Sequence, residues 1–264
     1  MAKTLTIEGL VEKILGYAPD SDTEIVRLAY EFAKDAHEGQ TRRSGEPYIT
    51  HPLAAAHILA DIRIDPVIVT ATLLHDVPED TEVTLEDIEK NFGSDIASLV
   101  RGITKLGKLK YRGVERYIEN LRKMFVAMAE DARVMLIKFA DRVHNLTTLG
   151  SLPPQKQYRI ALESLEIYAP IAGRLGIAEM KGQLEDLSFR YVYPKEYARV
   201  KNIRTEKLQG KEGYIDTVRT HAKEEIASAG VTICSIEGRE KRLFSFYQKL
   251  IRKDNKMARI YDLV

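Results

Sequence analysis

The sequence predicts an all-α domain that is followed by a helical linker and a small α/β fragment. Three observations indicate this fold class. Apolar residues recur at helical spacing through most of the first 195 residues. The segment 195–230 is highly charged, with few apolar residues before Ile215. Residues 231–238 then alternate as a strand does. We therefore expect domains at 1–195 and 196–264.

The elements of the first domain follow from periodicity and from residues that start or stop helices. Ser21 and Glu24 form a capping-box pattern ahead of the first strong apolar stripe. Pro66 suits a first helical turn, Thr84 suits an N-cap, and Gly93 suits a position just past a helix end. After that first stripe, we expect helices over 51–61, 66–77, 84–92, 94–103, 113–129, 131–149, 155–173 and 177–191.

The second part carries weaker signals. "VTICSIEG" predicts a strand over 231–238, "RLFSFYQKLIRK" predicts a helix, and "MARIYDLV" predicts a strand over 257–264. The charged segment before them predicts one or two exposed helices that link the domains.

Composition narrows the class of function. The 264 residues carry 40 basic and 39 acidic side chains, a net charge of +1, which argues against a dominant electrostatic role with nucleic acid or membrane. Cys234 is the single cysteine, so an internal disulfide and a thiolate zinc cage are excluded, and a reducing compartment is favoured. No apolar run is long enough to span a bilayer. We expect a cytoplasmic protein.

Ionisable residues gather where an apolar helix ends, in "LLHDVPEDT". His75 and Asp76 lie about 100° apart around a helix, so at its end both can lean toward one ion. With His51 and Asp141 they make a mixed nitrogen and oxygen ligand set that suits a divalent ion such as Mn²⁺. The alternative is that each residue is a cap or a satisfied polar group. Two apolar helices that deliver carboxylates nevertheless favour a shared cation.

Two further patterns adjoin these residues. Pro78 should end the helix and place Glu79 and Asp80 in a loop beside the ion. Asp141, Asn145 and Thr148 share one face of another apolar helix in "VMLIKFADRVHNLTTL".

Several segments together resemble a known family. "AHEGQTRRSGEPYITHP", "LLHDVPEDT", "FGSDIASLVRGITKLGK", "IKFADRVHNLTTL" and "EIYAPIAGRLGI" are similar to the hydrolase region of long RelA/SpoT-type (p)ppGpp synthetase/hydrolases, which belong to the HD superfamily. The resemblance covers roughly residues 20 to 264. It implies a helical HD-superfamily hydrolase domain that removes the 3′-pyrophosphate of (p)ppGpp, giving GDP or GTP plus pyrophosphate, with Mn²⁺ as cofactor.

The resemblance also implies roles for residues at matching positions. It implies metal ligands at His51, His75, Asp76 and Asp141, acid–base residues at Glu79 and Asp80, and contacts to a guanine nucleotide from Arg42, Arg43, Ser44, Asn145 and Thr148. Without the motif, the two arginines would be solvated loop residues, and the asparagine and threonine would form local backbone bonds. His144 could support the metal site, although a structural role is favoured, and Tyr48 could line the pocket or pack. His37, His57 and His221 are expected outside the site.

The end of the chain resembles the opening of the family's synthetase domain. Gly238-Arg239-Glu240-Lys241 departs at its third position from the usual Gly-Arg-Pro-Lys, and Asp262 matches a Mg²⁺ ligand. Because the synthetase and regulatory regions of such a bifunctional chain are absent, we expect no synthetase activity. Two rival functions stay open: another HD-superfamily nucleotide phosphohydrolase, and a catalytically silent nucleotide-sensing domain.

Overall fold

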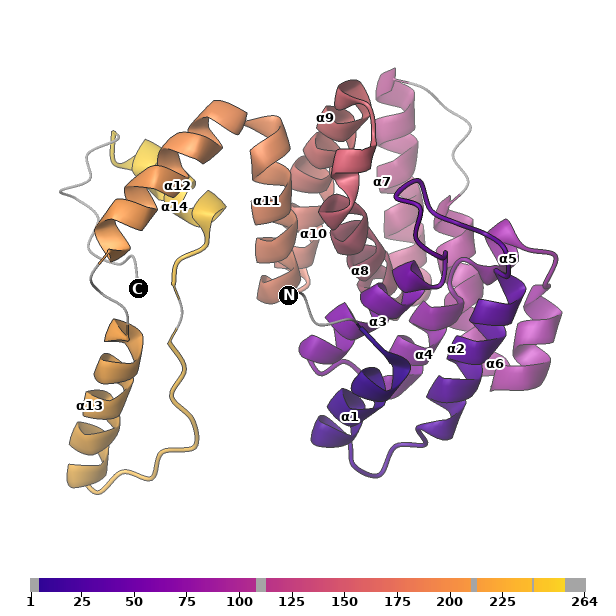
Figure 1. Ribbon diagram of the computed structural model, residues 1–264, viewed down its shortest axis with the longest axis horizontal. Coiled ribbons are helices and arrows are strands. Elements are labelled where there is room, and N and C mark those ends of the chain that lie inside the picture. Colours follow the sequence, from indigo (N-terminus) through magenta and orange to yellow (C-terminus); the bar gives the residue numbers. More distant parts are fainter. Residues whose placement is uncertain (1–4, 108–112, 210–212, 239, 255–264) are drawn as a thin grey trace. The chain divides into compact units, whose positions relative to one another are not determined.

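The computed structural model describes residues 5–107, 113–209, 213–238 and 240–254, and these residues form helices joined by loops (Figure 1). The all-α prediction is confirmed for them. They separate into two compact units, Met1–Leu184 and Glu185–Val264. Within this described part of the chain, no helix has both the length and the apolar character that crossing a membrane requires.

The first unit contains most of the helices. In chain order they are α1 (Ile7–Tyr17), α2 (Glu24–Ala36), α3 (Thr50–Asp61), α4 (Pro66–Leu74), α5 (Val77–Asp80), α6 (Leu85–Gly107), α7 (Gly113–Glu130), α8 (Arg133–Thr147), a 3₁₀ turn (Leu149–Ser151), α9 (Pro154–Glu163), a π-helical turn (Ser164–Tyr168), α10 (Ala169–Arg174) and the start of α11 (Ala178–Val192).

Helix α4 forms the centre of the first unit. It packs against α2, α3, α6 and α8, and all its residues from Ile68 to Leu74 are buried. A helix that is apolar on every face is stable only where neighbours cover all of it. Its two buried hydroxyls form hydrogen bonds within the helix: Thr70 donates to the carbonyl of Pro66, and Thr72 donates to the carbonyl of Ile68. The centre of the fold therefore leads directly into the polar residues at the end of α4.

Helix ends agree with the sequence where a side chain or a glycine fixes them. The Asp65 carboxylate accepts from the Val67 N–H at 2.8 Å ahead of Pro66. Thr84 and Asp87 cap each other, because the Asp87 N–H donates to Thr84 Oγ1 and the Thr84 N–H donates to Asp87 Oδ2. Gly93, with φ of 82°, divides α6 where a stop was expected.

Two local predictions are wrong. The capping box at Ser21 does not form: α2 begins after Thr23, and the Glu24 N–H instead bonds the Asp22 carboxylate. The helix expected over 66–77 stops at Leu74, and Glu79 and Asp80 lie in the one-turn helix α5 rather than in a loop. Pro78 occupies the first turn of α5, where its missing N–H costs nothing, so it starts a helix instead of ending one.

The second unit consists of the end of α11, then α12 (Pro194–Leu208), α13 (Tyr214–Ser228) and α14 (Leu243–Arg252). Its core is aromatic: the Phe189 ring stacks on Tyr247 at 4.8 Å and meets Phe244 edge-on at 5.3 Å. The helices of the charged linker and the last helix match their predictions.

The strand expected over 231–238 is wrong, because these residues form no strand. A strand needs a hydrogen-bonded partner, and among the described residues of this unit none pairs with it. The expected strand over 257–264 and Asp262 lie outside the described residues. The division between the two compact units falls inside α11, and the domain boundary near residue 195 stays a prediction.

Candidate metal centre and adjoining pocket

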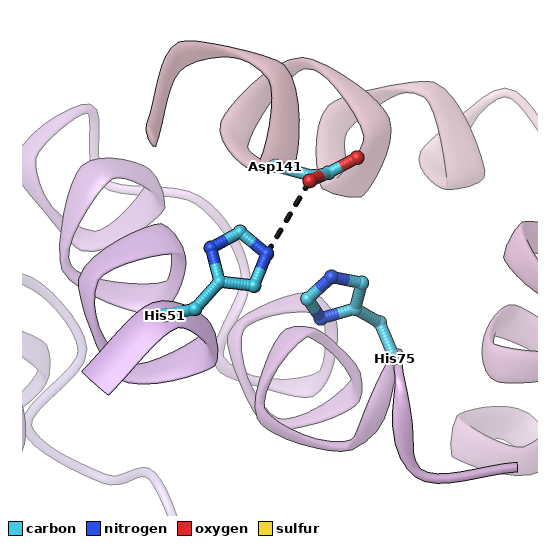
Figure 2. A group of neighbouring side chains, drawn as sticks. All are labelled: His51, His75 and Asp141. Atoms are coloured by element: carbon cyan, nitrogen blue, oxygen red, sulfur yellow. Dashed lines mark ion pairs between the residues drawn. The ribbon is translucent and has the colours of Figure 1, made fainter. Parts of the chain in front are cut away.

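Three helical segments of the first unit bring His51, His75 and Asp141 together (Figure 2). His51 is the second residue of α3, His75 follows the end of α4, and Asp141 lies on α8. One ligand atom from each lies within 4.8 Å of the others, and all three side chains are buried. His51 Nε2 is 3.3 Å from Asp141 Oδ1 and 3.6 Å from Asp76 Oδ2, so Asp76 adjoins the same group.

His75 has the protonation pattern of a metal ligand. Its Nδ1 lies 2.7 Å from the carbonyl oxygen of Thr72, which can only accept, so Nδ1 carries the proton. In a neutral ring Nε2 would present a lone pair; this atom is buried with no hydrogen-bond partner, although Asp76 Oδ1 is 3.1 Å away. A lone pair that faces a carboxylate oxygen is repelled unless a cation lies between them. The donor set therefore fits a divalent metal ion.

His51 is oriented by a second imidazole. Its Nδ1 lies 2.7 Å from Nδ1 of His144, on α8. Burial, and next the neighbouring His51, lower the pKa of His144 to about 3, so this ring is neutral near pH 7. If His51 donates from Nδ1, its Nε2 lone pair points toward Asp141. A structural role was favoured for His144, but its ring directly contacts His51 of the candidate metal group.

Asp141 is an ionised carboxylate inside the protein. Burial alone would raise its pKa, but the Lys138 ammonium at 2.9 Å and the nearby His51 hold that pKa well below its usual range. Burial also opposes protonation of Lys138, yet Asp141 raises the pKa of this lysine. Asn145 donates from its amide to Asp141 Oδ1. The carboxylate is thus held in one orientation by a lysine and an amide of its own helix.

Glu79 and Asp80 lie on α5, beside Asp76. Burial, and next the charge of Asp76, raise the pKa of Glu79. Asp80 is exposed, and its Oδ2 accepts a hydrogen bond of 2.7 Å from the Tyr48 hydroxyl. That hydroxyl is also 2.9 Å from Asp76 Oδ2.

A cavity of about 460 Å³ opens above this group of residues. Nine of the residues named from the sequence line it: Arg42, Arg43, Ser44, Tyr48, His51, Asp76, Asp141, Asn145 and Thr148. Its size is that of a small-molecule site. Apolar side chains complete the wall, from Leu149, Leu152 and Ile160.

Arg42 connects the loop before α3 to the polar face of α8. Its Nη2 donates to Asn145 Oδ1 at 2.8 Å, while its Nη1 is buried without a hydrogen-bond partner. Thr148 donates to the Asn145 carbonyl at 3.4 Å. A guanidinium with an unused buried donor beside an open cavity suits an anionic ligand.

Sequence reasoning passed over several residues of this site. Lys138 precedes Asp141 by one helical turn in "IKFADRVHN", and this spacing could have revealed it. Arg142 also lines the cavity, with its guanidinium 4.2 Å from the centre of the Tyr168 ring. His37 was expected outside the site, but its ring stacks on Tyr48 at 4.4 Å. His57 does lie elsewhere, bonded to the Thr6 carbonyl.

A helical bundle with two histidines and an aspartate gathered at its centre defines an HD-type domain, and comparison with known families agrees. Residues 29–178 match the HD domain model, which covers more than half of the chain. The chain belongs to the HD domain family.

Particular relatives resemble nearly the whole chain. It is 47% identical over 257 residues to the bifunctional (p)ppGpp synthase/hydrolase SpoT of Escherichia coli K12, which covers 97% of this chain and 36% of that protein. It is 43% identical over 261 residues to a GTP pyrophosphokinase of Streptomyces coelicolor, covering 98% of this chain and 31% of the relative. The chain thus spans about a third of the length of these curated relatives.

A solved structure has a similar fold. It is described as a metazoan ortholog of SpoT that hydrolyzes ppGpp, and it aligns with a TM-score of 0.53 at 25% identity. The match covers 64% of this chain and 96% of that one.

Proposed function

We propose that this chain hydrolyses the 3′-pyrophosphate of (p)ppGpp, giving GDP or GTP plus pyrophosphate, with Mn²⁺ as its metal. One observation carries the proposal: the buried Nε2 of His75, which has no hydrogen-bond partner, lies beside carboxylates that line a cavity bordered by arginines. Relatives named as (p)ppGpp hydrolases supply the substrate class.

The proposed metal ligands are His51, His75, Asp76 and Asp141. Their two imidazoles and two carboxylates suit Mn²⁺, with positions left for water. A divalent ion held there acidifies water and polarises a phosphoryl oxygen. The lysine and asparagine beside Asp141 keep that carboxylate ionised and oriented.

The cavity supplies the groups that a guanine nucleotide needs. Arg42 and Arg43 offer guanidinium groups to phosphates or to the face of the base, and the buried Nη1 of Arg42 has no competing partner. Ser44, Asn145 and Thr148 add smaller polar groups along the same wall.

Glu79 and Asp80 are the proposed acid–base residues. The raised pKa of Glu79 brings its proton exchange closer to neutral pH, as an acid–base group requires. Asp80 accepts a hydrogen bond from the Tyr48 hydroxyl, which also contacts Asp76, so the carboxylates of Asp76 and Asp80 are adjacent. We assign Glu79 and Asp80 jointly to orienting water and to protonating the leaving oxygen.

Two alternatives stay in view. The chain could hydrolyse a different nucleotide, or it could bind a nucleotide without turnover. Against the second alternative, the HD pair His75-Asp76 and the acidic pair Glu79-Asp80 are all present. The cytoplasmic location predicted from the sequence belongs to this proposal; the exposed Cys234, a free thiol, fits a reducing compartment.

One assay distinguishes the proposed function from these two alternatives. The protein is incubated with ppGpp and Mn²⁺, and GDP and pyrophosphate are quantified; GTP, dGTP and cyclic nucleotides are tested in parallel. We expect release of pyrophosphate from ppGpp that stops when a chelator is added. Survival of ppGpp while another nucleotide is hydrolysed would support the first alternative. Binding of ppGpp without hydrolysis would support the second.

A further inference from the structure

Asp80 is exposed, and the helix that carries it is a single turn, so neither burial nor a long helix fixes its carboxylate. An aspartate in such a place would sample several rotamers. In this structure its side chain and its backbone are both held by residues that precede α3. The hydroxyl of Tyr48 lies 2.7 Å from Oδ2, and the amide of Gln40 donates to the Asp80 carbonyl at 3.0 Å.

A histidine joins these two contacts. His37, 3% exposed at the end of α2, stacks its ring on Tyr48 with 4.4 Å between centroids and 20° between planes. Its Nδ1 lies 2.9 Å from Gln40 Oε1. Because the Gln40 amide nitrogen donates to Asp80, Oε1 is the atom that accepts, and His37 must donate from Nδ1. His37 thus fixes the orientation of both side chains that hold Asp80.

We propose that His37, Gln40 and Tyr48 form a brace that positions Asp80 for catalysis. Tyr48 is the central positioning residue, because its one hydroxyl proton lies between the carboxylates of Asp76 and Asp80. It separates two like charges that would otherwise repel at close range. This inference rests on the proposed function, since it assumes that Asp80 takes part in hydrolysis.

The contacts of the brace can be removed one at a time. Tyr48→Phe keeps the ring that stacks on His37 and deletes only the hydroxyl. Gln40→Glu keeps the acceptor for His37 Nδ1 and deletes the donor to the Asp80 carbonyl. The matched control is Tyr17→Phe, which removes a hydroxyl bond to the Ile64 carbonyl, 2.6 Å long, from a partly buried tyrosine of α1.

The test measures kcat and KM for ppGpp, the affinity for Mn²⁺, and hydrogen exchange of the amides from 77 to 82. We expect Tyr48→Phe to lower kcat about 10- to 100-fold with KM and metal affinity within twofold, and Gln40→Glu to lower kcat less. Amide exchange in the segment should accelerate in both variants and not in the control. In an Asp80→Asn background, Tyr48→Phe should cause no further loss of kcat.

Distinct results would overturn the brace. One is an unchanged kcat together with unchanged amide exchange in Tyr48→Phe. Another is a loss of Mn²⁺ affinity alone, which would mean that Tyr48 acts through Asp76. A third is a full additional loss of kcat when Tyr48→Phe is made in the Asp80→Asn background. An inactive wild-type protein would instead contradict the proposed function. The exchange measurement would then still decide on the brace, because it needs no substrate.

Discussion

The contact between His51 and His144 predicts a measurable effect on metal affinity. His51 can offer its Nε2 lone pair to a metal only if its proton resides on Nδ1, where His144 accepts it across 2.7 Å. The variant His144→Phe keeps an aromatic ring but removes the acceptor. His51 must then leave a buried N–H unsatisfied or move its proton to Nε2, which lies 3.3 Å from Asp141 Oδ1.

Only the shift of the proton to Nε2 weakens metal binding, because the proton must then return to Nδ1, where no acceptor remains; an N–H unsatisfied in both the free and the bound protein cancels from the Kd. An unsatisfied buried donor costs about 1–3 kcal/mol. A proton on Nε2 bonds Asp141 in the free protein, and this bond must be broken before metal binds. We therefore expect the Kd for Mn²⁺ to rise about 5- to 150-fold. His144→Asn is the matched variant, because its Oδ1 can occupy the place of Nδ1 and still accept the proton; it should recover most of the affinity.

The assay is a competition titration of Mn²⁺ against a fluorescent chelator, with thermal unfolding of the metal-free proteins as a check on folding. A His144→Phe protein that folds normally and binds Mn²⁺ within twofold of the wild type would refute the reasoning. Equal losses in the Phe and Asn variants would also refute it, because the acceptor would then be irrelevant.

Three further predictions test the site and the fold. Asp76→Ala should abolish both Mn²⁺ binding and turnover, measured by titration and by pyrophosphate release; retained metal affinity would contradict its role as a ligand. Glu79→Gln should keep Mn²⁺ but lower kcat about 10²- to 10⁴-fold, as loss of an acid–base group does; loss of metal would contradict that assignment. Burial lowers the pKa of His57 in the folded protein, so just below pH 6.5 the unfolded chain binds more protons than the folded chain. The free energy of unfolding should therefore fall as the pH drops from there, by up to about 1.4 kcal/mol per pH unit. In denaturant titrations at pH 7.5 and 5.5, His57→Gln should show a smaller pH difference than the wild type, whereas His221→Gln, altered at an exposed position, should match the wild type.

The sequence predicted most of the helices because their signals are local. Thr84 and Gly93 mark two helix limits that the structure reproduces, since a cap and a positive φ depend on one or two residues. Pro78 misled the prediction because a proline both ends and begins helices, and only the surrounding backbone decides between them. The strand over 231–238 depends on pairing with distant residues, which no local pattern specifies.

The candidate site likewise contains residues that local sequence identifies and contacts that it does not. His75 and Asp76 were identifiable because they are adjacent and end an apolar helix. The contacts that orient His51 and Asp80 were not, because each joins distant segments: His51 with His144, and Tyr48 with Asp80. The sequence shows which ionisable residues are present, but hydrogen-bond partners across 32 or 93 positions appear only when the chain is folded.

The burial of every residue of α4 from Ile68 to Leu74 has a consequence for mutational tolerance. A helix without a solvent-facing side offers no position where a change of side-chain volume is neutral, since buried Leu or Ile to Ala typically costs about 2–5 kcal/mol. In a saturation mutagenesis screen scored by activity, Val69 and Leu73 should therefore be as intolerant as His75, although neither is a candidate metal ligand. Intolerance alone would mark the whole segment as catalytic. Only a parallel screen for protein abundance would separate the residues that build the scaffold from those that act on substrate.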